Sequence, residues 1–483
     1  MKRLISALII LMVIVLGGYF ITGLVTEKTF KKNVKALGQA DLLSVDLITY
    51  RRGLFKSVAE LTWRIQTPEK IMHQDDGRSV IAPSKIYIFN MPVTMYHGPV
   101  IFEGGHLRFG LGFAHGDLPL PEAYTKKFHE VFTSNSMQPK LTLNAFITYL
   151  NKTQLEIELP AFKLFSMDEH SQLEWLGMNS SFVFYPKHTR LQGEILFNGL
   201  HLIGESFRLV LEKTTSSYDI YQAENGLFLG GARLHLPLFQ LTEQNSAELK
   251  LKEVDVSANS DVNDNRFESQ FHLAFESLLM HGKTYGPAEL DMSTQNLDAE
   301  VLASLNSRTH QLQHIHVNQS QAQQVLLSLL PDVPKLLSKG AIFEISTFKM
   351  GLPEGLMDAS LRVSFPETKK DAPPQLLPSV EGAGHLKIPA AFLRSILVRS
   401  YQQKIHMVSV PTKSSDTEES DATQVATVNL NQQATHQADK KLVELIEAGA
   451  LQAKGSDYVI ALKLSSGHLL VNEHPFHTGM LNF

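Results

Sequence analysis

The stretch FESQFHLAFE, residues 267–276, carries the pattern that decides the fold of this chain. Its apolar side chains alternate with polar or charged ones, so an extended segment here has one apolar face and one polar face. Half-apolar strands are typical of antiparallel sheets with one solvated face, whereas strands of parallel sheets are apolar on both faces. The stretch therefore predicts an antiparallel sheet.

The same two-residue period returns along the chain, and no sequence repeat of fixed length accompanies it. Between the first two such segments, Gly53 in Tyr50–Phe55 (YRRGLF) predicts a hairpin whose turn needs a positive φ. We therefore expect an α+β fold that is predominantly antiparallel β, with elongated, curved sheets and a few packed helices after one N-terminal transmembrane helix. The segments with this period are 43–48, 58–65, 154–159, 207–212, 249–252, 361–365 and 458–464.

Helical spacing of apolar residues interrupts the strands in four places. The predicted helices are 296–305, 321–337, a helix opened by Pro389, and 438–450. The polar, acidic segment Thr412–Thr427 predicts a mobile loop, and Pro366–Pro378 predicts a subdomain boundary. The expected organisation is 1–40 as anchor and juxtamembrane helix, 41–365 as a β-rich body, and 366–483 as a C-terminal helix and strand subdomain.

The apolar run Leu4–Val25 contains 22 residues without a formal charge, which is long enough to cross a bilayer once. It lacks the small-residue cleavage pattern of a signal peptide, so we expect an uncleaved signal anchor. Lysines and arginine flank both ends of the run, and the charge count therefore does not fix its orientation.

Composition excludes several classes of function. The net charge is −5, which offers no basic surface for nucleic acid. The chain has no cysteine, so disulfides, thiolate chemistry and cysteine-ligated zinc are excluded. Nucleophile-elbow, phosphate-loop, dinucleotide and His-Glu-x-x-His motifs are also missing from the sequence. We therefore predict a protein that is not an enzyme and that uses no cofactor.

Three groups of residues carry side chains that can ligate metal, and none is predicted to bind it. Asp261–Asn265 begins like a calcium loop, but Arg266 replaces the turn glycine, which favours a turn between two strands. The histidine clusters lack spaced acidic partners and are interpreted as surface residues. They are His310, His314 and His316, and His468, His474 and His477.

Four short motifs in fixed order resemble a known family. They are YRRGLFKS at 50–57, YHGP at 96–99, YGP at 285–287 and GHLLVN at 467–472. Together with the anchor, they resemble the YdgA-like bacterial envelope proteins, domain of unknown function 945. The resemblance implies an inner-membrane protein with its body in the periplasm and transfers no active site. The family-motif positions are Tyr50, Arg52, Gly53, Phe55, Ser57, His97, Gly98, Pro99, Tyr285, Gly286 and Pro287.

From the residues alone, Tyr50, Arg52 and Phe55 are expected to pack across strands, and 97–99 to form a strand-ending turn. The expected function is non-catalytic binding of lipid, an apolar ligand or another envelope protein at the inner membrane. Two alternatives remain open. The first is an oligomeric structural or assembly factor, and the second is an envelope hydrolase whose active site is not contiguous in sequence.

Overall fold

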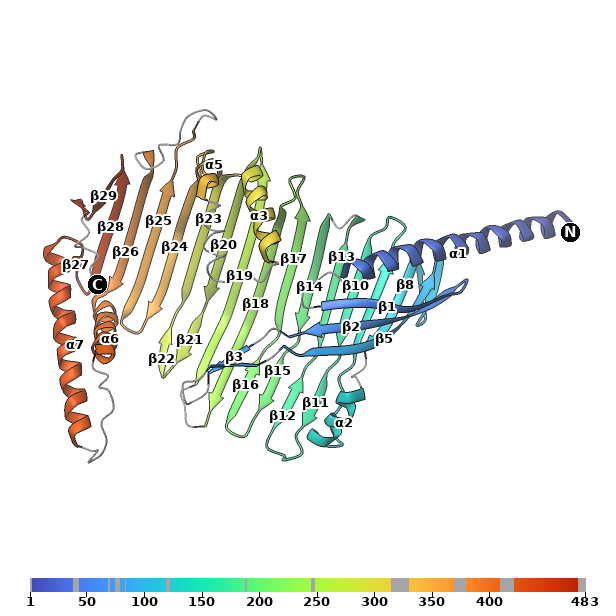
Figure 1. Cartoon of the computed structure of the whole chain (residues 1–483), viewed down its shortest axis with the longest axis horizontal. Helices are drawn as coiled ribbons and strands as arrows, with labels where there is room; N and C mark the ends of the chain where they lie inside the picture. The colour runs from blue at the N-terminus through green and yellow to red at the C-terminus, as the bar shows by residue number, and fades with distance from the viewer. Residues whose placement is uncertain are drawn as a thin grey trace. The chain divides into compact units, whose positions relative to one another are not determined.

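The structure is a computed structural model that describes residues 2–37, 43–67, 70–73, 79–82, 84–118, 122–186, 189–244, 248–313, 330–368, 379–408 and 421–476. The chain forms two compact units, Met1–Ser246 and Ala247–Phe483. Each unit is built on antiparallel sheet, as predicted (Figure 1). The predicted boundary at Pro366–Pro378 lies within the second unit, and residues 369–378 fall outside the described part, so that boundary stays a prediction.

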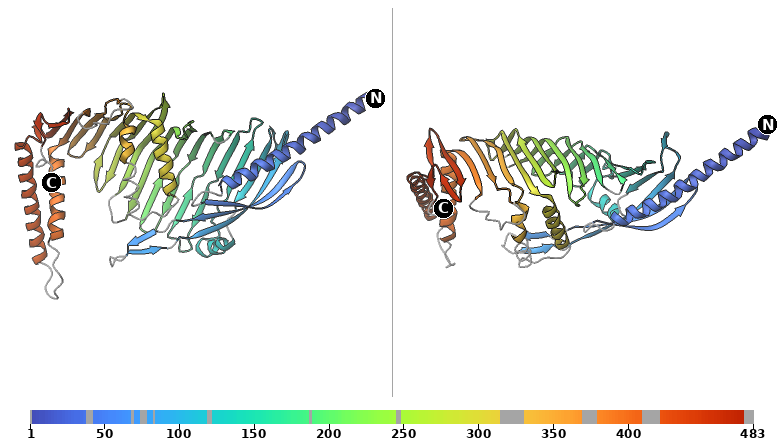
Figure 2. Two further views of the ribbon diagram at one scale, coloured as in Figure 1. Left: turned by 45° about the horizontal axis from the view of Figure 1, so that its top comes forward. Right: turned by 90° about the horizontal axis from the view of Figure 1, so that it is seen from above.

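The first unit begins with α1 (Lys2–Leu37), a single unbroken helix. The predicted anchor and juxtamembrane helix are therefore one element. In the described part of the chain, one helix is long and apolar enough to cross a membrane, and it is α1. The second half of α1 lies against the sheet, and its first half extends beyond it (Figure 2).

The sheet under α1 confirms the predicted hairpin, because Arg52 pairs with Ser57 across its turn. The reason given for Gly53 was wrong, since Gly53 does not have a positive φ. Glycine is required there because a Cβ would lie 2.5 Å from the Lys56 carbonyl oxygen. The strands, paired in order, are β1 (Leu43–Arg52), β2 (Lys56–Gln66), β5 (Ile86–His97), β8 (Gly112–Leu118) and β9 (Leu141–Ile147).

Beyond β9 the first unit continues as two series of antiparallel strands, and both pair with β18 (Phe228–Glu243). The first series is β10 (Thr153–Leu159), β13 (Met178–Phe184), β14 (Arg190–Phe197) and β17 (Thr214–Gln222). The second is β11 (Phe162–Phe165), β12 (Gln172–Trp175), β15 (Leu200–Ile203) and β16 (Phe207–Leu211). The remaining elements are the hairpins β3 (Lys70–His73) with β4 (Ser79–Ala82) and β6 (Val100–Glu103) with β7 (His106–Phe109), and α2 (Glu122–Val131).

The second unit is a sheet with helices at two places. Its main strands are β19 (Leu249–Asn263), β20 (Arg266–Phe275), β23 (Ala288–Asp298), β24 (Ile342–Leu352), β25 (Gly355–Ser364), β26 (Glu381–Pro389), β28 (Asp457–Ser465) and β29 (His468–Val471). Shorter strands are β21 (Ser277–Met280), β22 (Lys283–Tyr285), β27 (Gln452–Lys454) and β30 (His474–Pro475). The helices are α3 (Ala299–Gln313), η2 (Leu330–Asp332), α5 (Val333–Leu336), α6 (Ala390–Val408) and α7 (Asp421–Glu447).

Most predicted helices are found with shifted ends. The Asp298 carboxylate accepts the backbone N–H groups of Glu300 and Val301, which starts α3 close to the predicted position. Of the predicted helix 321–337, residues 321–329 lie outside the described part, and the remainder forms η2 and α5. The predicted loop Thr412–Thr427 was wrong for residues 421–427, which begin α7. A helix anchored by packing can propagate into a polar segment that would not form a helix alone.

Fully buried side chains are concentrated at the helices. One cluster lies under α1 and includes Val34, Ala59 and Met95, and another joins α6 and α7 around Ala438 and Leu442. A small third cluster lies where α3 and α5 meet β23. Large parts of both sheets therefore have no buried core on either face among the described residues.

The closing turn depends on Asn472, which is 3 % exposed. Its side chain accepts the N–H of Ala461 and donates to the carbonyls of Gly449 and Ala450. We expect Asn472→Ala to lower the free energy of unfolding by about 2–4 kcal/mol, because three backbone groups lose their hydrogen bonds to this buried side chain. Thermal unfolding of the full chain in detergent checks this. Glu473→Gly serves as the control and should raise stability slightly, since Glu473 has a φ of 70°; equal effects of the two changes would contradict the assignment.

Candidate functional site

Eight of the family-motif positions lie together against α1, although they come from two separate stretches of sequence. They are carried by the turn between β1 and β2 and by the end of β5, and residues 18–34 of α1 pack over them (Figure 1). Tyr50, Arg52 and Phe55 contact the helix, and the cross-strand packing predicted for them stays a prediction. The Phe55 ring meets Tyr19 at 4.8 Å, and the Tyr50 ring meets Phe30 at 6.3 Å.

The centre of this contact is a buried Ser57–His97 pair. Ser57 Oγ lies 2.7 Å from His97 Nε2, and each residue is 1 % exposed. Gly23 of α1 covers the imidazole, since a Cβ at Gly23 would lie 3.5 Å from the ring. His97 Nδ1 has no hydrogen-bond partner within the described part of the chain. We call this cluster the anchor-docking site.

Hydroxyl groups of α1 attach the helix to strand-end carbonyls around the pair. Thr22 donates to the Gly98 carbonyl and Thr26 donates to that of Leu111 at 3.0 Å. Tyr19 donates to the Val100 carbonyl at 2.6 Å. These bonds join three hydroxyl groups of α1 to backbone carbonyls at the ends of the strands, so they fix the helix in register and in rotation.

A salt bridge between the hairpin turn and α1 lies at the solvent-exposed side of the site. Arg52 Nη1 lies 3.3 Å from the Glu27 carboxylate, and its guanidinium stands 5.4 Å from the centre of the Phe20 ring. Glu27 also pairs with Lys31 one turn later in the helix, at 2.7 Å. Arg52 therefore connects the turn of the hairpin to two turns of α1.

The two Gly-Pro elements, one in each unit, share a cis peptide bond and a hydrogen bond donated by the glycine. Gly98–Pro99 and Gly286–Pro287 are both cis peptides. Gly98 donates to the Leu111 carbonyl, and Gly286 donates to that of Gly351 at 2.7 Å. The predicted strand-ending turn at 97–99 is confirmed, since β5 ends at His97. Tyr285, Gly286 and Pro287 belong to the second unit and are not part of the anchor-docking site.

Burial shifts the pKa values of two side chains in the site, His97 and Tyr50. It lowers the pKa of His97, with a smaller contribution from the nearby Arg52 charge. Burial also raises the pKa of the Tyr50 phenol. Both groups are therefore neutral at pH 7, and protonation of His97 opposes the docking of α1.

The pH dependence of stability follows from this shift. Because the folded pKa of His97 lies below its unfolded value, its neutral form is fully accommodated above about pH 6.5, and stability is lost as the pH falls below that value. We expect the melting temperature of the wild type to fall more between about pH 7.5 and pH 5 than that of His97→Gln, which keeps a side-chain nitrogen for Ser57. Parallel pH profiles would contradict this role.

Ser57 and His97 have the spacing of a nucleophile and its base, but no substrate reaches them in this packing. Both lie beneath Gly23 and are buried. A hollow of about 330 Å³ elsewhere in the first unit is lined by Phe109, Phe113 and Phe146 with Arg108, and it brings no histidine and acid together. The anchor-docking site is therefore interpreted as a structural contact between α1 and the sheet.

The strand registers produce a second feature, which is an apolar face on each sheet. In the first unit, one row across five strands consists of Phe162, Trp175, Leu200, Leu211 and Phe239. In the second unit, matching rows run across β20, β23, β24, β25, β26 and β28. They are Phe271, Met292, Ile345, Leu361, Gly384 and Leu462, and beside them Leu273, Leu290, Phe348, Ala359, Leu386 and Ile460. The alternation of apolar and polar residues along each strand was predicted from the sequence. The pairing of apolar residues across neighbouring strands was not.

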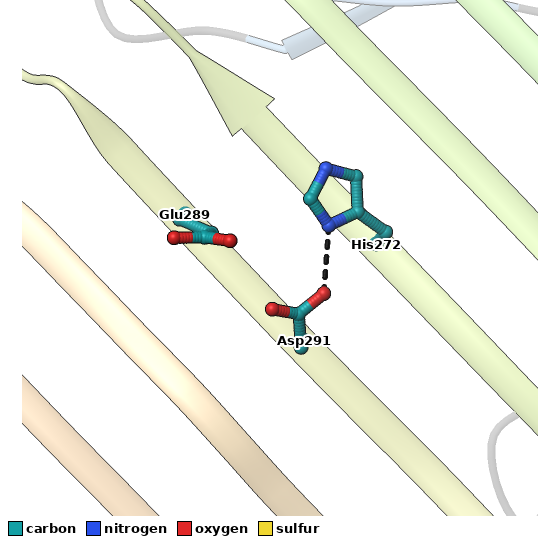
Figure 3. Close-up of side chains that lie close together, drawn as sticks. All are labelled: His272, Glu289 and Asp291. Atoms are coloured by element: carbon teal, nitrogen blue, oxygen red, sulfur yellow. Dashed lines mark hydrogen bonds and ion pairs between the residues drawn. The ribbon is translucent and has the colours of Figure 1, made fainter.

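The opposite face of the second unit is polar, and among its described residues it holds a cluster with metal-ligand chemistry. His272 Nδ1 lies 2.7 Å from the Asp291 carboxylate, with Glu289 beside them (Figure 3). The three ligand atoms lie within 4.8 Å of one another, so they could hold one divalent cation with water completing its shell. His272 and Asp291 already satisfy each other, and Lys349 lies opposite Glu289.

The histidine groups weighed from the sequence are spread out or fall outside the described residues. His310 lies in α3, and His314, His316 and His477 are not described. His468 and His474 lie in β29 and β30. The turn expected at Asp261–Asn265 is found at Asp264 and Asn265, between β19 and β20, whereas residues 261–263 belong to β19.

Comparison with known proteins adds the family. A family model described as a bacterial protein of unknown function, DUF945, matches residues 1–478. Searches of the curated proteins and of the solved structures gave no match.

Proposed function

Because the chain belongs to the DUF945 family of bacterial proteins of unknown function, we propose that it is a membrane-anchored, non-catalytic protein of the bacterial envelope that binds lipid. In this proposal α1 crosses the inner membrane once as an uncleaved signal anchor, and the body lies in the periplasm. The apolar faces of the sheets bind phospholipid acyl chains, and an apolar segment of another envelope protein is the alternative ligand.

The observation that carries the proposal is the apolar face of the second unit, whose rows contain exposed side chains in the described part of the chain. In the second unit Met292 is 38 % exposed, Leu361 40 % and Leu462 36 %. Apolar rows of this extent are unfavourable in water and mark a surface that binds another apolar body.

Acyl chains suit this surface better than a polar ligand does. The rows of the second unit contain aliphatic and aromatic side chains and glycine, which offer contact area without hydrogen-bond donors. The anchor-docking site holds the first unit firmly against α1, so its sheet stands beside any bilayer that α1 crosses. Lipid is then the most abundant apolar partner within reach.

Mass spectrometry of the purified full chain tests the proposal. The chain is extracted in a mild detergent, exchanged into a second detergent, and analysed for bound phospholipid. We expect several phospholipid molecules per chain to survive the exchange. A lipid-free chain at every detergent concentration would contradict lipid binding, and a crosslinked protein in place of lipid would favour the alternative ligand.

Self-association is a second candidate, favoured by exposed apolar residues on the helices of the second unit. Val443 and Ile446 of α7 are 52 % and 38 % exposed, and Ile396 of α6 is 44 % exposed. A second copy could pack on these positions. Light scattering of the full chain in detergent decides this: a strict monomer removes the candidate, and a dimer that Val443→Glu dissociates supports it.

A further inference from the structure

The part of α1 that stands free of the body is too short to cross a bilayer. Its apolar run begins at Leu4, after Lys2 and Arg3, and contact with the sheet begins at Gly18, where a Cβ would lie 3.6 Å from Pro99. The run Leu4–Gly17 has 14 residues and is about 21 Å long. The hydrocarbon core of a bilayer is about 30 Å thick.

The outward face of α1 nevertheless stays apolar beyond Gly18. Phe20, Ile21, Leu24 and Val25 are 52 %, 61 %, 42 % and 37 % exposed, and the first charged residue after them is Glu27. Leu4–Val25 is about 33 Å long, which matches the core. Residues 18–25 therefore have the sheet on one side and an apolar surface suited to lipid on the other.

Strand tips around residues 18–25 expose apolar side chains of their own. Two of these tips contact the helix, since Phe55 packs on Tyr19 and Tyr19 donates a hydrogen bond to the Val100 carbonyl. A third tip lies beside them, since Tyr149 donates to the Pro99 carbonyl. Both views of Figure 2 show α1 projecting past this end of the strands. We call these side chains the collar: Leu54, Phe55, Phe102, Leu107, Phe109 and Leu150, exposed by 39–75 %.

We propose that the collar is inserted in the membrane interface, so that this end of the first unit enters the bilayer instead of lying outside it. This rests on the proposed membrane anchoring of α1. Residues 18–25 belong both to the apolar run that crosses the bilayer and to the contact with the sheet. The collar beside them therefore lies about 5–10 Å below the membrane surface, as interfacial apolar residues do. Arg51 and Lys56, both exposed, flank the Leu54–Phe55 tip and reach the lipid phosphates.

Spin labelling of the full chain in phosphatidylethanolamine–phosphatidylglycerol vesicles tests this, since the chain has no cysteine of its own. Single cysteines replace Phe102 and Leu150 in the collar, Met12 in the free helix, and Ser206 on the opposite edge of the first unit. Phe102 and Leu150 are 70 % and 75 % exposed, so the fold tolerates the change. We expect the labels at 102 and 150 to be accessible to oxygen and protected from a polar nickel complex, as at 12, and the label at 206 to show the reverse.

The outcomes separate this inference from the proposed function. Labels at 102 and 150 that are as open to nickel as the label at 206, with 12 protected, would overturn the collar and leave the anchor intact. A label at 12 that is also open to nickel would overturn both. As a second measurement, Phe102→Glu with Phe109→Glu should open position 150 to nickel at least tenfold, and an unchanged accessibility at 150 would contradict the collar.

Discussion

Replacing Gly23 with leucine is expected to detach α1 from the sheet, whereas the same replacement at Gly17 is expected to be tolerated. A Cβ at Gly23 already reaches ordinary contact with the His97 ring, so the rest of a leucine side chain has no space. At Gly17 nothing lies within 4 Å. Overpacking of this kind costs about 1–3 kcal/mol. Gly17→Leu should instead raise stability slightly, because leucine favours the helix.

Thermal unfolding and limited proteolysis of the full chain in detergent measure this difference. In Gly23→Leu we expect a lower melting temperature for the first unit and faster cleavage near the β1–β2 turn, which loses the helix above it. Gly17→Leu controls for the added apolar surface in the same helix. Equal melting temperatures for the two variants would mean that α1 is not held at His97.

Replacing Leu361 with lysine is expected to remove most of the bound lipid, whereas Ser360→Lys should leave it unchanged. The two residues are neighbours on β25 and point to opposite faces, because side chains alternate along a strand. Both are exposed, so neither lysine has to be buried for the unit to fold. A charge among acyl chains costs several kcal/mol unless it escapes to water.

Phospholipid per chain after detergent exchange, read by mass spectrometry, is the measurement for this pair. We expect a several-fold loss for Leu361→Lys, and a larger loss when Met292→Lys is added in the same row. Circular dichroism confirms that the sheet is intact in each variant. Equal lipid content in Leu361→Lys and Ser360→Lys would place the lipid elsewhere.

The local parts of the fold could be predicted from the sequence because their signals are local. The period of two in FESQFHLAFE gave the strand β20 and its one-sided character, and Asp298 marked the start of α3. Rows such as Phe271, Met292 and Ile345 could not be predicted, because they depend on the register between strands. The register shift between Asp291 and Met292 keeps the apolar residues of neighbouring strands paired, and no local sequence pattern predicts it.

The anchor-docking site was only half visible in the sequence. The family motifs marked Ser57 and His97, but their hydrogen bond joins residues 40 positions apart. The docking of α1 did leave a signal that was missed, since Gly18, Thr22 and Thr26 recur every four residues. That spacing of small residues is typical of helices that pack closely. The transmembrane prediction for Leu4–Val25 used only the length of the run and its lack of charge. These two properties do not indicate that one side of the helix packs on a sheet.

Photo-crosslinking from the apolar face tests the central claim most directly. A diazirine amino acid is placed at Leu361 or at Ser360 of the full chain in cells, and the crosslinked products are identified by mass spectrometry. Lipid binding predicts phospholipid adducts from position 361 and none from 360. Adducts only to water or to a second copy of the chain at 361 would contradict it.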